Sequence, residues 1–209
     1  MRAIGEIKQV QVQRSKLKIS QKPSRRYDPT PITLVARLLL TPQGVIGLTQ
    51  DNEHIVDVHH AHHPETRYSD GLNGISIGFT SHYAAMRQQF GTHLFDGCAG
   101  ENILVETRQE QEEEQVAHGI VIQSSSTGQL IYLKDIMVAA PCVEFSHFAL
   151  GDDPAYTTPE SLKAALQFLD NGRRGFYATL AAPAEATIQA GDMVFVLEPG
   201  EKSDIEEER

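Results

Sequence analysis

The chain carries two thiols, Cys98 and Cys142, and one of them stands in a sequence context suited to chemistry. Cys142 follows Pro141 at the end of an apolar stretch, where the proline fixes its own φ and biases its predecessor to extended geometry. A cysteine there can be held at a strand end and face a cleft. Thiolates ligate soft metals and act as nucleophiles in persulfide chemistry. A buried structural cysteine is the alternative, and the sequence alone leaves it open.

A histidine-rich run at residues 57–63, Asp-Val-His-His-Ala-His-His, could also ligate a metal. A zinc hydrolase of the β-lactamase type needs the pattern His-x-His-x-Asp-His. Aligning His60 and His62 with that pattern puts a proline and a glutamate where the aspartate and the last histidine belong. Side chains alternate between faces on an extended segment, so the four histidines are not expected to share one site. We expect one histidine to matter and the others to be solvated.

Two glycine-containing stretches, residues 95–102 and 170–177, bring polar side chains into turns where a ligand can approach the backbone closely. In the first, Asn102 could hydrogen-bond a pterin edge or a phosphate. In the second, Arg173 and Arg174 carry guanidinium groups, whose planar forks suit phosphate oxygens. No Gly-x-x-x-x-Gly-Lys-Ser phosphate loop occurs in the chain. Ordinary turns therefore remain the alternative for both stretches.

Composition limits the class of function. The formal net charge is −10, and the acidic runs at residues 110–114 and 206–208 predict solvated loops or tails. We expect no nucleic-acid binding, because phosphate contacts need a basic face and the basic stretch at residues 16–26 is small. No apolar run approaches the length of a membrane span. Two cysteines and no leader-like start indicate a reducing, cytoplasmic setting.

The elements that must position these residues are mostly short strands. Apolar and polar residues alternate over the first 20 residues. Further strands are predicted at residues 32–40, 45–48, 55–59, 73–79, 99–106, 116–123, 129–138, 176–180 and 193–197. Many short strands with few helices favour a mainly β fold, a barrel with helical additions. We expect one domain over residues 1–197, an exposed hairpin extension at 107–118 and a disordered acidic tail at 198–209.

Two helices are predicted. The first covers residues 83–90, with Thr80 or Ser81 as its cap and Gly91 as its stop. The second covers residues 159–169, where one apolar face at helical spacing is formed by Leu162, Ala165, Leu166 and Leu169. Thr157 and Glu160 stand at capping-box spacing before it.

Taken in order, several of these pieces resemble the MOSC family, named for the C-terminal domain of molybdenum-cofactor sulfurase. The match spans about residues 44–197. Its elements are Asp57-Val58-His59, Gly100-Glu101-Asn102, Ala140-Pro141-Cys142 with Phe145, Arg174-Gly175-Phe176-Tyr177 and Gly191-Asp192-Met193-Val194. Each element is short, but their order, with a Pro-Cys pair at the centre, is fairly specific. The chain departs from the family after Asp57-Val58-His59, where histidines replace glycines.

The resemblance implies a mainly β, MOSC-type barrel similar to the pyruvate-kinase β-barrel, with a few added helices. It implies that Cys142 ligates molybdenum or carries sulfur. It also implies a bound molybdenum cofactor (molybdopterin), and the polar residues that we expect to hold it are Asp57, His59, Asn102, Arg173 and Arg174.

Three functional hypotheses follow, and the sequence leaves open whether the protein is an enzyme. The first is a cofactor-binding protein that transfers sulfur or reduces N-hydroxylated compounds through Cys142, with a separate cysteine desulfurase or reductase as partner. The second is a non-catalytic protein that stores or delivers the cofactor. The third is a zinc-binding protein that uses His59–His63.

Overall fold

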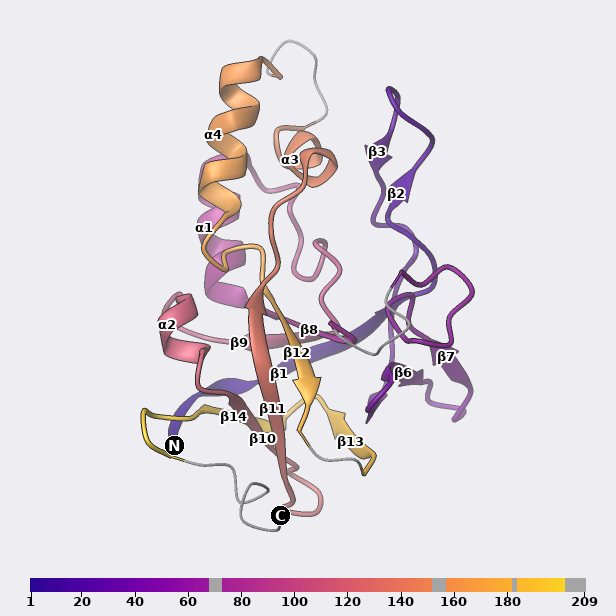
Figure 1. Cartoon of the computed structure of the whole chain (residues 1–209), viewed down its shortest axis with the longest axis vertical. Coiled ribbons are helices and arrows are strands. Elements are labelled where there is room, and N and C mark those ends of the chain that lie inside the picture. The colour runs from indigo at the N-terminus through magenta and orange to yellow at the C-terminus, as the bar shows by residue number, and fades with distance from the viewer. Residues whose placement is uncertain (68–72, 152–156, 182–183, 202–209) are drawn as a thin grey trace.

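Seven strands close into a barrel that forms the lower half of the molecule in Figure 1. The computed structural model describes residues 1–67, 73–151, 157–181 and 184–201. The barrel order is β14-β10-β11-β12-β8-β9-β1, and pairing of β1 with β14 closes it. The strands are β1 (Arg2–Gln13), β8 (Ile75–Phe79), β9 (Ile103–Glu106), β10 (Ile120–Gln123), β11 (Leu130–Val138), β12 (Phe176–Leu180) and β14 (Met193–Val196). The expected mainly β barrel is therefore confirmed, with 35% of the described residues in strands and 17% in helices.

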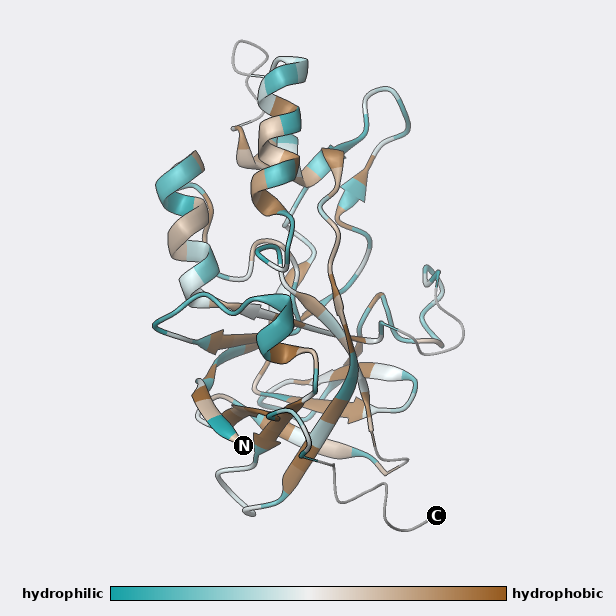
Figure 2. Cartoon of the chain, turned by 60° about the vertical axis from the view of Figure 1, so that its left-hand side comes forward, coloured by the Kyte–Doolittle hydropathy of each residue, from teal (hydrophilic) through white to brown (hydrophobic). Residues whose placement is uncertain are grey.

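The barrel is built by strands whose apolar residues point inward. In β1, Val10 and Val12 are buried, as the alternation in the sequence predicts, and Ile7 joins the same core across a register shift between Ile7 and Gln9. Figure 2 shows the same feature as brown, hydrophobic strands gathered around the barrel interior. Neighbouring strands are antiparallel except β8 and β9, whose parallel pairing needs a crossover. The helix α1 (Thr80–Phe90) provides that crossover.

A second sheet packs beside the barrel, and one strand predicted from the sequence is divided at this sheet. Its order is β13 (Ala186–Gln189), β5 (Arg37–Thr41), β6 (Gly44–Leu48) and β7 (His54–Val56). The stretch 32–40, expected as one strand, is divided into β4 (Ile32–Leu34) and β5. The division occurs because the chain changes partners: Val35 N–H donates to Val10 O at 3.1 Å, and Ala36 N–H donates to Leu48 O at 2.9 Å.

Helices and an arm cover one end of the barrel (Figure 1). α4 (Pro159–Leu169) has the predicted bounds, but Thr158 and not Thr157 caps it, accepting a hydrogen bond from Ser161 N–H at 3.2 Å. Thr80 does not cap α1, because its hydroxyl is bound to the backbone of Thr107. The helix α3 (Val143–Ala149) was not predicted. The arm is a hairpin of β2 (Lys18–Ile19) and β3 (Arg26–Tyr27), and β3 packs against α3.

The acidic segments are more ordered than their composition suggests. Residues 107–118 form no hairpin; they contain α2 (Glu113–Val116), and Val116 is buried in the barrel core. A reciprocal pair of hydrogen bonds between Glu112 and Gln115 begins that helix. At the C-terminus, the Glu201 carboxylate binds the N-terminal amine and accepts a hydrogen bond from Glu198 N–H. Residues 202–209 of the expected tail lie outside the described residues.

Within the described residues, none of the helices is both long and apolar enough to cross a membrane.

Candidate functional site

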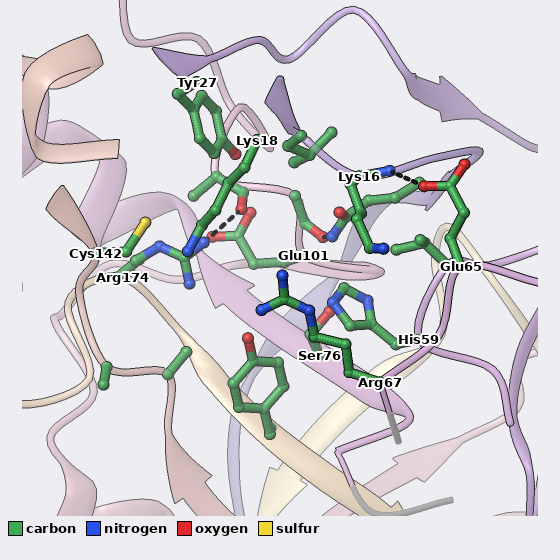
Figure 3. A pocket seen from close by; sticks show the side chains of 18 of the residues that line it. Lys16, Lys18, Tyr27, His59, Glu65, Arg67, Ser76, Glu101, Cys142 and Arg174 are labelled. Carbon is green, nitrogen blue, oxygen red and sulfur yellow. Dashed lines mark hydrogen bonds between the residues drawn. The ribbon is translucent and has the colours of Figure 1, made fainter. Parts of the chain in front are cut away.

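A cavity of about 300 Å³ lies where the arm, α3 and the barrel meet (Figure 3). Six segments far apart in the sequence line it. They are residues 13–27 of β1 and the arm, 58–67 after β7, Ser76 of β8, 99–101 before β9, 139–142 before α3, and 174–177 at the start of β12. The volume is at the lower end of the range of small-molecule sites.

Cys142 lines this cavity, as the sequence predicts. Its position differs from the prediction, because β11 ends at Val138 and Cys142 is the residue that begins α3. The Cys142 carbonyl accepts hydrogen bonds from the Ser146 N–H and hydroxyl, both at 3.0 Å, which fixes the backbone that carries the thiol. Cys98, by contrast, is buried in the core beneath the helices, and burial raises the pKa of its thiol.

Arg174 lies beside Cys142 in the cavity wall (Figure 3). One terminal nitrogen donates to Ala99 O at 3.2 Å, and the guanidinium carbon lies 5.3 Å from the centre of the Phe145 ring. Among the residues that the structure describes, its buried Nε–H has no hydrogen-bond partner. A buried donor without a partner costs folding free energy, so a hydrogen-bond acceptor placed at this N–H would be favourable.

Burial would lower the pKa of the Arg174 guanidinium, but nearby acidic groups, Tyr177 first among them, raise it instead. Arg174 is therefore a fixed cation. The turn that aims it requires Gly175, whose φ is +113° and where a Cβ would stand 2.7 Å from Ile77 O.

Arg173, the neighbouring residue, points elsewhere. Its Nε donates to the Glu110 carboxylate at 2.9 Å, and Nη1 donates to Phe168 O at 2.6 Å. The guanidinium also stacks on the Phe168 ring, 4.3 Å from its centre. Arg173 does not line the cavity, so the cofactor-binding role expected for it has no geometric support.

The predicted residues Asp57, His59 and Asn102 form a connected network. The Asp57 carboxylate is fully buried and accepts from Gln13 N–H at 2.7 Å and from the Asn102 amide at 2.9 Å. Its other oxygen lies 3.1 Å from His59 Nδ1, which orients the imidazole at the cavity wall. Asn102 is also fully buried, and its carbonyl accepts from the Ser76 N–H and hydroxyl. Asn102 therefore positions Asp57 and β8, and it does not line the cavity.

The other histidines of the run make local contacts, and the His60 and His62 ring centres lie 5.4 Å apart. His60 Nδ1 accepts from His62 N–H at 3.2 Å, and His63 Nδ1 accepts from Glu65 N–H at 3.1 Å, so both rings brace the local loop. In the part of the chain that the structure describes, no three His, Cys, Asp or Glu side chains are grouped to hold a metal ion. The zinc hypothesis has no geometric support among these residues.

Glu101, which the sequence pattern does not distinguish within its motif, lines the cavity at 4% exposure. The Tyr83 hydroxyl donates to its carboxylate, with oxygen separations of 2.7 and 2.9 Å. Burial raises the pKa of this carboxyl above its ordinary value of 4.5. A carboxyl with a raised pKa in the cavity wall can take part in proton transfer there.

The arm contributes basic side chains to the cavity wall, a role that the sequence does not predict. Lys16, Lys18 and Arg25 line the cavity, whereas the sequence predicts only that this basic stretch is too small for nucleic-acid binding. Lys18 Nζ lies 3.5 Å from the Glu144 carboxylate, and Arg25 donates to the same group. Burial would raise the pKa of Glu144, but its backbone hydrogen bond and these two cations lower it to about 2. Glu144 on α3 thereby holds the arm over the cavity.

No family model matches the chain, and no curated protein matches it in sequence. Three solved structures share its fold. The YuaD protein from Bacillus subtilis has a TM-score of 0.55 at 10% identity, over 93% of this chain and 96% of that one. A hypothetical protein has a TM-score of 0.53 at 14% identity, over 98% of this chain and 74% of that one.

The third is YiiM from Geobacillus stearothermophilus, with a TM-score of 0.51 at 19% identity, over 93% of this chain and 76% of that one. YiiM is a MOSC-domain protein. The fold is MOSC-like. At these identities the likeness concerns the fold alone, and it agrees with the architecture that the sequence resemblance implies.

Proposed function

We propose that the cavity binds a molybdenum cofactor of the molybdopterin type, with Cys142 as the residue that ligates the metal or carries sulfur. The observation that carries this proposal is the pairing of Cys142 with Arg174 in one cavity of a strongly acidic chain. Five cationic side chains and two carboxylates line that cavity, against a formal net charge of −10 for the whole chain. The local excess of positive charge favours an anionic ligand where the overall field opposes one.

The residues present fit the cofactor in three respects. The thiol of Cys142 is a soft donor of the kind that a sulfur-bound metal accepts. The Arg174 guanidinium is a fixed cation with an unused buried Nε–H, which suits a phosphate oxygen. The cavity volume of about 300 Å³ accommodates a small heterocycle.

When bound, the cofactor would supply a two-electron redox couple and a coordination position for sulfur. The chain itself would bind its phosphate through Arg174 and place the Cys142 thiolate at the cavity wall. Glu101 would hold or release a proton beside Arg174, and Asp57 would keep the His59 ring oriented. A separate reductase or cysteine desulfurase would then provide electrons or sulfur.

The test is cofactor content in protein made by a host that synthesises the cofactor. Elemental analysis gives molybdenum per chain, and the fluorescence of the oxidised pterin gives pterin per chain. Wild type is expected to hold both. Cys142→Ser should lose molybdenum, and Arg174→Ala should bind the pterin about tenfold or more weakly, since 1.4 kcal/mol is one decade.

Arg173→Ala is the matched control, because it removes the same charge from the adjacent residue outside the cavity. It should bind like wild type. Arg174→Lys keeps the charge but loses the fork, so it should bind between wild type and the alanine variant. A wild-type protein with neither metal nor pterin, or a folded Arg174→Ala variant that binds as tightly as wild type, would refute the proposal.

A further inference from the structure

One buried hydroxyl group holds both of the groups through which residues 99–101 act on Arg174. Tyr83, on α1, is fully buried and does not line the cavity. Its hydroxyl accepts a hydrogen bond from Ala99 N–H at 2.9 Å, and Ala99 O in turn accepts one from Arg174 Nη2 at 3.2 Å. The same hydroxyl donates to the Glu101 carboxylate, whose charge acts on Arg174. The position of Arg174 and the charge that it meets therefore both involve Tyr83.

The Glu101 carboxyl group lies in a slot that two glycines leave open. A Cβ on Gly78, in β8, would stand 2.6 Å from Glu101 Oε1, and a Cβ on Gly175, just before β12, would stand 3.3 Å from Glu101 Cγ. Figure 3 shows the Glu101 carboxyl group next to the Arg174 guanidinium. A buried carboxylate costs folding free energy unless hydrogen bonds or a cation compensate it, and Tyr83 and Arg174 provide both.

Several other titratable groups act on Glu101, and none of them has a pKa that is shifted toward neutral pH. Besides Tyr83 and Arg174, these groups are Asp96 and Cys98 in the loop before β9, and Tyr27 in β3. Burial would raise the pKa of Asp96, but its contacts with Lys8 and Arg87 lower it. Burial raises the pKa of the Cys98 thiol and of both tyrosines, so these groups stay neutral. Glu101 is the acid of this cluster whose pKa burial raises toward neutral pH.

We propose that Tyr83 is a positioning residue for the anion site: its hydroxyl fixes Arg174 through Ala99 and keeps the Glu101 carboxylate charged against it. The inference rests on the proposed function, in which Arg174 binds the phosphate of the cofactor. A charged Glu101 offsets the guanidinium and weakens anion binding, whereas a protonated Glu101 leaves the full charge of Arg174 to the anion. Anion binding and protonation of Glu101 are therefore coupled, and the coupling is reciprocal.

Sulfate is the probe for this coupling, because it stays a dianion from pH 8 to pH 5 and requires neither molybdenum nor pterin. Titration calorimetry on the full chain, at fixed ionic strength, gives the dissociation constant at each pH. Wild type should bind sulfate roughly tenfold more tightly at pH 5 than at pH 8, which is a typical size for coupling between two sites. Glu101→Gln keeps the shape of the side chain without its charge and should lose this change. His59 also lines the cavity, so any pH dependence that remains in Glu101→Gln is subtracted from the wild-type profile.

Tyr83→Phe distinguishes a positioning role from a purely structural one. Loss of the hydroxyl removes the side-chain donor to Glu101, so the pKa of Glu101 should rise and the midpoint of the sulfate profile should move up by roughly one pH unit. Tyr27→Phe is the matched control, because the Tyr27 hydroxyl is also buried and donates to Cys98 O in the same loop at 2.8 Å, and not to Glu101. The control should keep the wild-type midpoint, whatever its stability in urea.

The inference is overturned if Tyr83→Phe and wild type share one midpoint, since a purely structural tyrosine would change affinity alike at every pH. Unchanged pH dependence in Glu101→Gln, a variant that keeps Tyr83, overturns it as well. So does a wild type that binds no sulfate, an Arg174→Ala variant that binds it as tightly as wild type, or an equal midpoint shift in Tyr27→Phe.

Failure of the proposed function is separately visible. Wild type from a cofactor-competent host would then contain neither molybdenum nor pterin, while sulfate binding kept its dependence on Glu101 and Tyr83.

Discussion

Replacing Glu144 by glutamine should loosen the arm that covers the cavity. The carboxylate is 6% exposed and is held by Arg25 and by Lys18, whose Nζ lies 3.5 Å away. These contacts lower its pKa from an ordinary 4.5 to about 2. At 1.36 kcal/mol for each pKa unit, that difference corresponds to about 3 kcal/mol. The two cations keep 36% and 28% of their side chains exposed, so solvent screening reduces the expected loss to about 1–2 kcal/mol.

The pH dependence gives the sharper test. A carboxyl whose folded pKa is lowered stabilises the protein fully above its unfolded pKa, here 4.5, and loses that effect as pH falls toward the folded value of about 2. The free energy of unfolding in urea should therefore differ most between wild type and Glu144→Gln at pH 7. By pH 3 the difference should fall below half of that value.

The matched control is Glu106→Gln, an exposed carboxyl at the end of β9. It should change the free energy of unfolding little at either pH. Equal stability of wild type and Glu144→Gln at pH 7, or a difference that does not decline toward pH 3, would refute the assignment of this ion pair as the arm's anchor.

Three further predictions concern single side chains. Iodoacetamide at pH 8, followed by mass mapping, should label Cys142 at least about tenfold faster than Cys98, because burial raises the pKa of Cys98; equal rates would contradict this. Burial also lowers the pKa of His82 from 6.5 to about 4, so it costs stability as pH falls from 6.5 to 4. The melting temperature of His82→Gln should decline less over that range than that of wild type, whereas the exposed control His118→Gln should follow wild type. Thr158→Ala should lose about 1 kcal/mol of unfolding free energy in urea through loss of the α4 cap, and an unchanged midpoint would exclude that cap.

Local patterns in the sequence were enough to predict much of the barrel and one helix. Alternation placed Val10 and Val12 inward in β1, and helical periodicity gave the bounds of α4. These elements are encoded by the spacing of apolar residues, which depends on side-chain direction and not on distant partners. The prediction that Cys142 and His59 stand at a cleft also agrees with their place in the cavity wall. Their functional roles stay predictions.

Tertiary structure decided what local patterns do not encode. The sequence has little helical signal at α3, which is stabilised by non-local packing such as Phe145 on Tyr27, with ring centres 5.0 Å apart. β13 exists because it pairs with β5, almost 150 residues earlier. Strand pairing of that kind is a long-range contact that no short window contains.

The charged residues of the site show most clearly the difference between what the sequence predicts and what the tertiary structure decides. Arg173 and Arg174 are chemically identical neighbours, yet only the second faces the cavity, because the turn at Gly175 aims it inward. The basic stretch of the arm looks like an ordinary loop in the sequence. It becomes a cavity wall because Glu144, more than a hundred residues away, holds it in place. Residue types set which chemistry is available to this protein, and the folded contacts decide which of those residues share a site.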